Sequence, residues 1–465
     1  MSAKSITLRF TKYKRFSILC ILVITLLILC SLPFDDNPFN LFSYHTSSHT
    51  NTMDTQPALI TDNERYLAYL PHSGLSNQRI ELSNALLLAY MLNRTLIIPP
   101  AFLGTVFGWM PREKLTERLD WLTTPKDFHK LCQQPTPGKL ASYTQHSRCE
   151  EYRHFGTIAW SDLHDFRPLQ EAGIKIKFQS IVSMKQIRQD LQIINDDDIY
   201  IHHDIQLYDW RLYENKTEAV GLLQNGLNYF DSFAGRRYYK VFLPRHFQRR
   251  REKLVYLAGI FGSTRFTIIQ PEHKAMRQLI ADVLHYRLDT PLGETVNAIV
   301  NYLGGKSSFM SVHFRTSDKP FKKEVSANLK QFVKNMTEIV GGGVNDGNSS
   351  RACVRIRDDQ EQDLTLLGKG VNVYIATDHK DPRGEKSELL PWFEQFPCTT
   401  TLSDLPDHLF QPLNKLRDLV SPVRPLKSFL IPIVDAMVAA HARRILTTPR
   451  STFSKYIEEL HKAWA

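Results

Sequence analysis

The stretch "HSGLSNQRIELSNALLLAYMLNRTLIIPP", residues 72–100, begins with small and polar residues, continues through apolar residues and ends on two prolines. The segment "RYLAYLP" (65–71) before it predicts a strand. A helix over residues 77–92 and a strand in "TLIIPP" are predicted to follow. Strand, loop, helix and strand make one βαβ unit, whose right-handed crossover gives a parallel pair of strands.

A second α/β unit is predicted in the C-terminal half of the chain. The segments "SSFMSVHFR" (307–315) and "NVYIATD" (372–378) predict strands, and residues 425–445 predict a helix despite Pro432. Between the two units, strands are predicted within 198–208 and 254–262, and a helix over 271–286. The fold class is therefore α/β, with two Rossmann-like domains that face a cleft, and "GGGVNDGNSS" predicts a disordered insertion near residues 338–351.

The N-terminus predicts a membrane anchor. Residues 16–32 are uncharged and almost wholly apolar, and they follow five basic residues and no acidic one. A cleaved signal peptide is the alternative, but no small-residue cleavage site precedes Pro33. The basic flank predicts a single-pass type II protein of the Golgi or endoplasmic reticulum membrane, with residues 1–15 in the cytosol and the catalytic region in the lumen.

The anchor and stem leave two predicted domains. Residues 33–62 are rich in Ser, Thr, Asn and Pro and predict a flexible stem. The N-terminal Rossmann-like domain is expected over 63–290 and the C-terminal one over 291–465. The formal net charge of +10 falls by half once the five basic residues before the anchor are set aside, so no nucleic-acid partner is predicted.

Cysteines and sequons fit a luminal location. Four cysteines follow the anchor, and we expect two local bridges in an oxidising compartment, with four free buried thiols as the alternative. The expected pairs are Cys132 with Cys149 and Cys353 with Cys398. The candidate glycosylation sites are Asn93, Asn215, Asn335 and Asn348.

The loop at Gly74 has the composition of a ligand-binding turn. Small residues let the backbone approach a ligand, and a helix N-terminus offers free N–H groups. The loop is not G-x-G-x-x-G, which argues against a dinucleotide. The amide of Asn77 suits sugar hydroxyls, although Asn77 as an ordinary helix cap explains the residue equally well.

Two strand ends in the second unit carry polar residues. Alternation places His313 and Arg315 on one face near the carboxyl edge, where arginine can hold a phosphate with two parallel N–H bonds. The alternative is that the pair bridges a domain boundary. Thr377 and Asp378 end the next strand, where they can meet a base or ribose, or where Asp378 simply caps the next helix.

The last helix is predicted to begin with hydroxyl groups. Ser451 and Thr452, together with the helix N–H groups, can hold a phosphate, and Phe453 can stack on a base. A plain helix cap is the equally economical alternative.

Taken in order, these motifs resemble the protein O-fucosyltransferase family. "GLSNQ" followed by "LNRTLIIPP" is similar to the family's N-terminal glycine/asparagine motif, and "HFR" to its H-x-R motif. "YIATD" resembles its ATD motif and "STFSKYI" its Ser/Thr-Phe motif. The resemblance spans about residues 66–457, of which 105–290 match nothing in the family's pattern.

The resemblance implies a GT-B-type fold and transfer of fucose from GDP-fucose to a hydroxyl of a protein or glycan, with inversion and without a metal. By residue, Arg315 would hold the β-phosphate with His313 beside it, and Asn77 would lie near the fucose and the reacting oxygen. Gly74 would line the donor site. The other implied donor contacts are Asp378 with guanine or ribose, Ser451 and Thr452 with the diphosphate, and Phe453 with the guanine face.

Ser73 departs from some relatives, which place a glutamate base there. A serine cannot take a proton unaided. Either another carboxylate such as Glu81 serves, or departure of GDP precedes deprotonation; the second alternative is favoured. It predicts that Arg315→Ala abolishes transfer while Glu81→Gln leaves it largely intact.

No metal site is predicted. The D-x-D within "NDDDIY" (195–200) precedes a strand and reads as a solvated turn, and the adjacent side chains of His202 and His203 point to opposite faces of a strand. Two other functions remain open from the sequence: the same fold with another nucleotide sugar such as GDP-mannose, or a glycan-binding homologue without catalysis.

Overall fold

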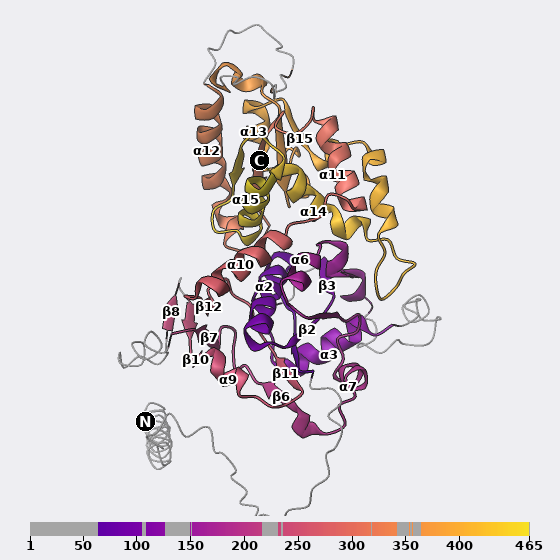
Figure 1. The fold of residues 1–465 in the computed structure, drawn as a ribbon. Helices are drawn as coiled ribbons and strands as arrows, with labels where there is room; N and C mark the ends of the chain where they lie inside the picture. The colour runs from indigo at the N-terminus through magenta and orange to yellow at the C-terminus, as the bar shows by residue number, and fades with distance from the viewer. Residues whose placement is uncertain are drawn as a thin grey trace, which may run out of the picture. The chain divides into compact units, whose positions relative to one another are not determined.

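The computed structural model describes residues 64–104, 108–125, 149, 151–215, 231–233, 236–317, 319–341, 353, 356 and 364–464. The predicted anchor and stem lie outside these residues. No helix among those described has the length and apolar character needed to cross a membrane. Residues 63–465 form one compact unit (Figure 1).

The N-terminal part is built on a parallel sheet in the order β5-β2-β1-β11-β6. Its strands are β1 (Tyr66–Tyr69), β2 (Thr95–Ile98), β5 (Ile176–Phe178), β6 (Ile199–His202) and β11 (Leu254–Leu257). The predicted parallel pairing of β1 with β2 is confirmed, with Tyr66 opposite Thr95. Strands β1, β2 and β11 are buried along their whole length, as in parallel sheets that helices cover on both faces.

The C-terminal part is built on a second parallel sheet in the order β15-β14-β13-β16. Its strands are β13 (Met310–Phe314), β14 (Val373–Thr377), β15 (Thr399–Thr401) and β16 (Ile445–Thr447). Both strands predicted here from the sequence, at 307–315 and 372–378, are present. The two parallel sheets confirm the predicted α/β class, whereas the GT-B-type pair of Rossmann-like domains that face a cleft remains a prediction.

Three smaller sheets among the described residues were not predicted. One has the order β10-β7-β12, with strands Lys240–Phe242, Trp210–Tyr213 and Phe266–Thr267. The others are the antiparallel pairs β3 with β4 and β8 with β9, with strands Ala101–Gly104, Phe155–Ile158, Asp231–Phe233 and Arg236–Tyr238.

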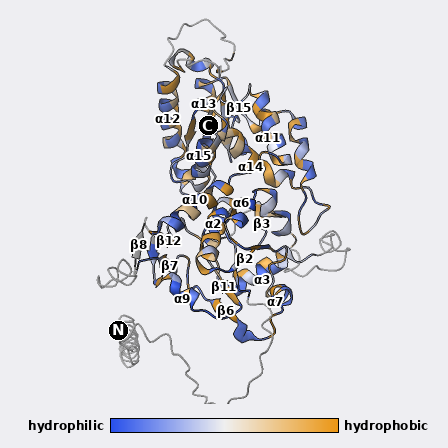
Figure 2. Ribbon diagram, viewed as in Figure 1, coloured by the Kyte–Doolittle hydropathy of each residue, from blue (hydrophilic) through white to orange (hydrophobic). Residues whose placement is uncertain are grey.

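The α-helices of the N-terminal part are α2 (Leu75–Leu92), α3 (Arg112–Thr123), α6 (Arg167–Glu171), α7 (Met184–Asp190), α9 (Pro244–Gln248) and α10 (Pro271–Val283). Those that follow are α11 (Pro291–Tyr302), α12 (Phe321–Val340), α13 (Leu390–Gln395), α14 (Lys427–Ala440) and α15 (Thr452–Trp464). Short 3-10 helices include η2 (Asp196–Asp198) and η7 (Asp407–Lys415). The predicted helix at 425–445 is α14, which includes Pro432, and Figure 2 shows hydrophobic colour along much of it.

One hydrophobic core joins the two large sheets. Side chains of α2, α14 and α15 belong to the same buried cluster, among them Leu86, Val434 and Ile457. A second cluster lies between α12, α13 and the strands β13 and β14. The shared core explains why residues 63–465 form one unit although they contain two parallel sheets.

Two predictions about the C-terminal half have clear outcomes. Cys353 and Cys398 form the predicted disulfide; Cys149 is also disulfide-bonded, and its predicted partner Cys132 lies outside the described residues. The predicted insertion at 338–351 begins too early, because residues up to Val340 complete the last turn of α12. Most of its remaining residues lie outside the described part of the chain.

Candidate functional site

The start of α2 differs from the simplest sequence interpretation. Gly74 is the N-cap residue, with φ −73° and ψ 165°, and the helix begins at Leu75. Asn77 therefore lies in the first turn, so the alternative in which it caps the helix is wrong. Its Oδ1 atom is buried and accepts no hydrogen bond from the described residues. A buried amide oxygen without a donor is unfavourable, which suits a group that binds a ligand.

Buried polar side chains of α2 hold the neighbouring loops. The Nε2 atom of Gln78 donates to the carbonyl oxygens of Ser73 at 2.9 Å and Phe102 at 3.0 Å. One and a half turns later, the Nδ2 atom of Asn84 donates to the carbonyl oxygens of Ile260 at 2.8 Å and of Gly262 at 3.0 Å. These bonds fix the loop after β1 and the loop after β11 against the helix.

Glu81 lies too deep to meet a substrate. Both Glu81 and His72 have 0% of their surface exposed. The Oε1 atom of Glu81 is 3.1 Å from Nε2 of His72, and its Oε2 atom accepts the backbone N–H of His72 at 3.1 Å. Burial raises the pKa of Glu81 well above its usual value, while it lowers the pKa of His72 to about 4. Glu81 therefore acts through His72 or not at all.

At the C-terminal sheet, His313 connects β13 to the last helix. Its Nδ1 atom lies 2.7 Å from Oγ of Ser454 on α15, and its ring centroid lies 5.2 Å from that of Phe453. Burial lowers the pKa of His313 to about 4, so the imidazole is neutral at pH 7. His313 thus contributes hydrogen bonding rather than charge.

Arg315 and Asp378 form an ion pair across the ends of β13 and β14. An Nη atom of Arg315 lies 2.9 Å from Oδ2 of Asp378, and 29% of the Arg315 side chain is exposed. Asp378 also accepts the backbone N–H of Thr316 at 2.7 Å and the hydroxyls of Thr316 and Ser317. Burial alone would raise the pKa of Asp378, but the Ser317 hydrogen bond and the Arg315 charge lower it.

These hydrogen bonds give Asp378 a structural role. Its two oxygens hold the backbone after β13 and the guanidinium of Arg315 together. A direct contact with guanine or ribose remains a prediction. Thr316 and Ser317 were missed in the sequence, although "TSD" directly after H-x-R is a run of hydroxyls and acid at a strand end.

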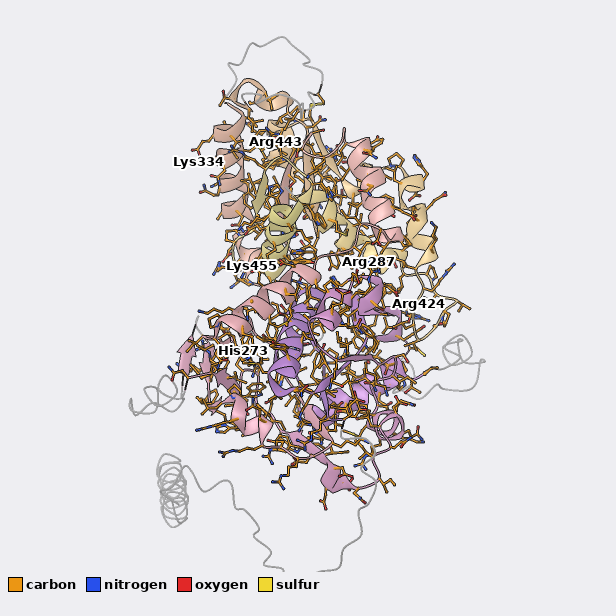
Figure 3. All side chains as sticks on the ribbon, viewed as in Figure 1. His273, Arg287, Lys334, Arg424, Arg443 and Lys455 are labelled. Atoms are coloured by element: carbon orange, nitrogen blue, oxygen red, sulfur yellow. A yellow bond between two sulfur atoms is a disulfide. The ribbon has the colours of Figure 1, made fainter. Side chains whose placement is uncertain are left out.

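The predicted hydroxyl motif lies at the start of α15. The Oγ atom of Ser451 accepts the backbone N–H of Ser454 at 3.2 Å, so Ser451 does cap the helix. Thr452 is exposed, and Phe453 packs partly on the core. The hydroxyl of Thr448, also missed, donates to the carbonyl of His313 at 2.9 Å and accepts the N–H of Arg315 at 3.0 Å. Figure 3 shows Lys455 on the same first turn of α15.

The helices that carry the first and last motifs touch each other. Arg79 on α2 forms an ion pair with Glu459 on α15 at 3.0 Å. Its guanidinium carbon lies 3.6 Å from the ring centroid of Tyr456. Arg79 follows Asn77 by two residues, so this contact ties the first turn of α2 to the helix that carries Ser454 and, through it, His313.

Three titratable residues gather after β6. Ligand atoms of His202, Asp204 and Asp209 lie within 4.8 Å of one another. The sequence interpretation compared only adjacent residues; His202 and Asp204 are two apart, and their side chains meet at 3.4 Å. Lys240 pairs with Asp209 at 2.7 Å, so one carboxylate of this group already has a cationic partner. The D-x-D at Asp196–Asp198 is a mostly exposed 3-10 turn, as predicted.

A pocket of about 320 Å³ lies at the other end of α2 and includes Tyr90, Asn93, Glu272 and His273 in its lining. None of the predicted donor residues contributes to it. Asn93 is the exposed C-cap of α2 and Asn215 is exposed, whereas Asn335 is half-buried in α12. Asn348 lies outside the described residues, and glycosylation at all four sites remains a prediction.

Comparison with known proteins agrees with the motifs. No protein-family model matches the chain. Over 84 residues the chain is 39% identical to O-fucosyltransferase 30 of Arabidopsis thaliana. The chain is similar to O-fucosyltransferases. This match covers 17% of the chain and 17% of that relative, so it spans about one sixth of either protein.

Two groups of solved structures also match. The crystal structure of POFUT1 in complex with GDP is 12% identical, with a TM-score of 0.38 over 86% of this chain and 95% of that one. Fucosyltransferase NodZ from Bradyrhizobium is 13% identical, with a TM-score of 0.38 over 85% of this chain and 92% of that one. The resemblance to fucosyltransferases predicted from the motifs is confirmed by the sequence match.

Proposed function

We propose that this protein transfers fucose from GDP-fucose to a hydroxyl of a protein or glycan acceptor, with inversion and without a metal. The main support for this proposal is the Arg315–Asp378 ion pair at the carboxyl ends of β13 and β14. Ligands of open α/β sheets bind at such an edge. A partly exposed guanidinium held in place by a carboxylate is suited to a diphosphate, because it offers a fixed cation with parallel N–H donors.

The surrounding groups support a leaving diphosphate. His313 is neutral and buried beside Arg315, so it adds hydrogen bonding without competing for the anion. The N-terminus of α15, a helix of 13 residues, adds partial positive charge. On this proposal these groups stabilise the negative charge that develops on GDP as the bond between fucose C1 and the β-phosphate oxygen breaks.

On the acceptor side, we place Asn77 near the fucose and the reacting oxygen. Its buried, unpaired Oδ1 atom can accept a hydrogen bond from a sugar or acceptor hydroxyl. We also propose that the protein is a type II membrane protein of the Golgi or endoplasmic reticulum, anchored by residues 16–32. The Cys353–Cys398 disulfide supports an oxidising compartment.

The test is donor hydrolysis by the purified full chain in detergent, with EDTA present and GDP-fucose, GDP-mannose or UDP-galactose offered separately. GDP release from GDP-fucose is expected to exceed release from the other donors. A preference for GDP-mannose would mean that the protein is a glycosyltransferase with a different donor sugar. Turnover of only the UDP-sugar, or loss of turnover with EDTA that Mn²⁺ restores, would reject the proposal. Tight GDP binding without turnover would indicate a binding protein.

A further inference from the structure

Three polar side chains form a chain that leads from the protein interior to the turn before α2. The Oγ atom of Ser73 lies 2.8 Å from Nδ1 of His72. On the other side of the ring, Nε2 of His72 lies 3.1 Å from Oε1 of Glu81. His72 and Glu81 are fully buried, whereas Ser73 is partly exposed. The order is hydroxyl, imidazole and carboxyl group, as in the triads that activate a serine hydroxyl, although Nε2 of His72 and Oε1 of Glu81 are not in hydrogen-bonding geometry with any described residue.

The backbone holds Ser73 in an unusual conformation. Its φ of 70° lies in the left-handed region, which residues other than glycine adopt only when the surrounding structure enforces it. Here the Nε2 atom of Gln78 fixes the Ser73 carbonyl at 2.9 Å, while Glu81 fixes the backbone N–H of His72 at 3.1 Å. In this conformation the Ser73 hydroxyl contacts the buried imidazole.

The surroundings define the charge of the buried pair. Tyr69 of β1 lies close enough to Glu81 to interact with it electrostatically. Arg265, in the segment after β11, is buried and places positive charge near Glu81 and His72. Asp204, after β6, also interacts electrostatically with Arg265. The edge of the Phe261 ring covers the His72 imidazole, with centroids 5.7 Å apart.

We propose that Ser73, backed by His72 and Glu81, is the group that takes the proton of the acceptor hydroxyl. This inference rests on the proposed fucosyl transfer. The acceptor oxygen bonds to fucose C1 as the bond from C1 to the GDP oxygen breaks, and that electron pair leaves with GDP. The acceptor proton passes to Oγ of Ser73, and the Ser73 proton passes to Nδ1 of His72. Glu81 then faces the imidazolium across 3.1 Å.

This assignment answers the difficulty posed by a serine at position 73. The hydroxyl is not unaided, because the imidazole of His72 and the carboxyl group of Glu81 lie behind it. Ser73 touches the acceptor in this scheme, whereas His72 and Glu81 are positioning residues that act through it. The expectation from the sequence that Glu81→Gln leaves transfer intact is reversed, because the structure links Glu81 to Ser73.

The experiment measures GDP release from GDP-fucose by the full chain in detergent, with water as the acceptor, and GDP affinity by calorimetry. No release by the unmodified protein would reject the proposed function itself. Given release, Ser73→Ala is expected to lower kcat by about 100-fold or more, as for loss of a general base, with GDP affinity within twofold. The matched control is Ser76→Ala, which removes a hydroxyl from the first turn of α2 and is expected to keep full activity.

Two further readouts separate proton transfer from a structural role. Ser73→Asp places a carboxylate at the same point and is expected to recover at least tenfold over Ser73→Ala. The kcat of the unmodified protein is expected to rise with pH as buried Glu81 loses its proton and can face the imidazolium as a carboxylate, and Ser73→Ala is expected to lack this rise. Activity of Ser73→Ala within threefold of the unmodified protein, or the same pH profile in both, would overturn the inference.

Discussion

Arg315 is the side chain whose chemistry is least replaceable in the proposed reaction. Lysine keeps the charge but not the planar pair of N–H donors or the fixed pairing with Asp378. We expect Arg315→Ala to lower kcat for GDP release by about 1000-fold and Arg315→Lys by about 100-fold, in line with loss of oriented donors. Steady-state kinetics with GDP-fucose measures both. Arg383→Ala removes another arginine that pairs with an aspartate, Asp404, and is expected to retain activity.

Asp378 is predicted to act with Arg315 as a unit. Asp378→Asn keeps the shape but removes the charge and replaces one accepting oxygen with an NH2 donor, which then faces N–H and O–H groups that need an acceptor. We expect about 1 to 3 kcal/mol of lost stability and a fall in activity. The double variant Asp378→Asn/Arg315→Ala should be little less active than Arg315→Ala alone, because coupled residues are not additive. Fully additive losses would show that the two residues act independently.

At this scale the sequence identified the candidate site residues but not the side chains that hold them in place. His313, Arg315 and Asp378 follow from residue type at strand ends. Their partners Ser454 and Thr448 belong to segments more than 130 residues distant in the chain. Asn77 was misplaced for a local reason, because the helix begins two residues earlier than predicted and Asn77 therefore lies in the first turn rather than at the cap.

At the scale of elements, the contact between α2 and α15 is expected to stabilise the fold. Arg79 stacks on Tyr456 at 3.6 Å and pairs with Glu459 at 3.0 Å. Stacking is expected to contribute about 0.5 to 2 kcal/mol and the partly exposed ion pair up to about 1 kcal/mol. Arg79→Ala should therefore lower the free energy of unfolding by about 1 to 3 kcal/mol, and Glu459→Gln by less than about 1 kcal/mol.

Urea denaturation monitored by circular dichroism measures both Arg79 and Glu459 variants. An equal loss in the two would mean that the ion pair, rather than the ring stacking, carries the contact. Arg79→Lys is the intermediate case, since it keeps the charge and loses the planar stacking surface.

Elements were predictable where a single period dominates. The strands β1, β2, β13 and β14 are short apolar runs, and α14 is apolar enough to be found despite Pro432. Helix α12 was missed although Val325, Leu329, Phe332, Met336 and Val340 repeat at helical spacing. The many charged residues between these apolar positions made the helical period hard to recognise in the sequence. The sheet β10-β7-β12 could not be found, because its strands have only two to four residues and pair across long separations.

At the scale of the whole molecule, the two predicted halves share more core than the sequence indicates. Rossmann-like halves were predicted from alternation alone, which says nothing about how much surface they bury together. The main hydrophobic cluster includes residues of both parallel sheets, such as Leu67 and Tyr374. Hydrophobic side chains at the junction, including Tyr286 and Tyr456, are indistinguishable in sequence from those inside either half.

A buried histidine at this junction is expected to make the fold sensitive to acid. His164 stacks between Trp160 and Tyr286, with ring centroids 5.7 and 5.3 Å away, and Tyr286 in turn meets Tyr456 of α15. Burial lowers the pKa of His164 to about 3, below its usual value of 6.5. Between these two pKa values the unfolded chain binds a proton at His164 that the folded chain does not. The free energy of unfolding is therefore unaffected by protonation of His164 above pH 6.5 and decreases progressively as the pH falls toward 3.

We accordingly expect His164→Asn to lower the free energy of unfolding at pH 7, because the ring stack is lost. The variant should also lose less stability than the unmodified protein when the pH falls from 6.5 to 4.5, because it lacks a histidine that becomes protonated only on unfolding. Urea titrations at several pH values measure the difference. Replacing the exposed His203 by Asn is the control and should leave the slope unchanged. Parallel slopes for His164→Asn and the unmodified protein would show that acid acts elsewhere. Other buried histidines whose pKa is lowered by burial include His72, His313 and His441.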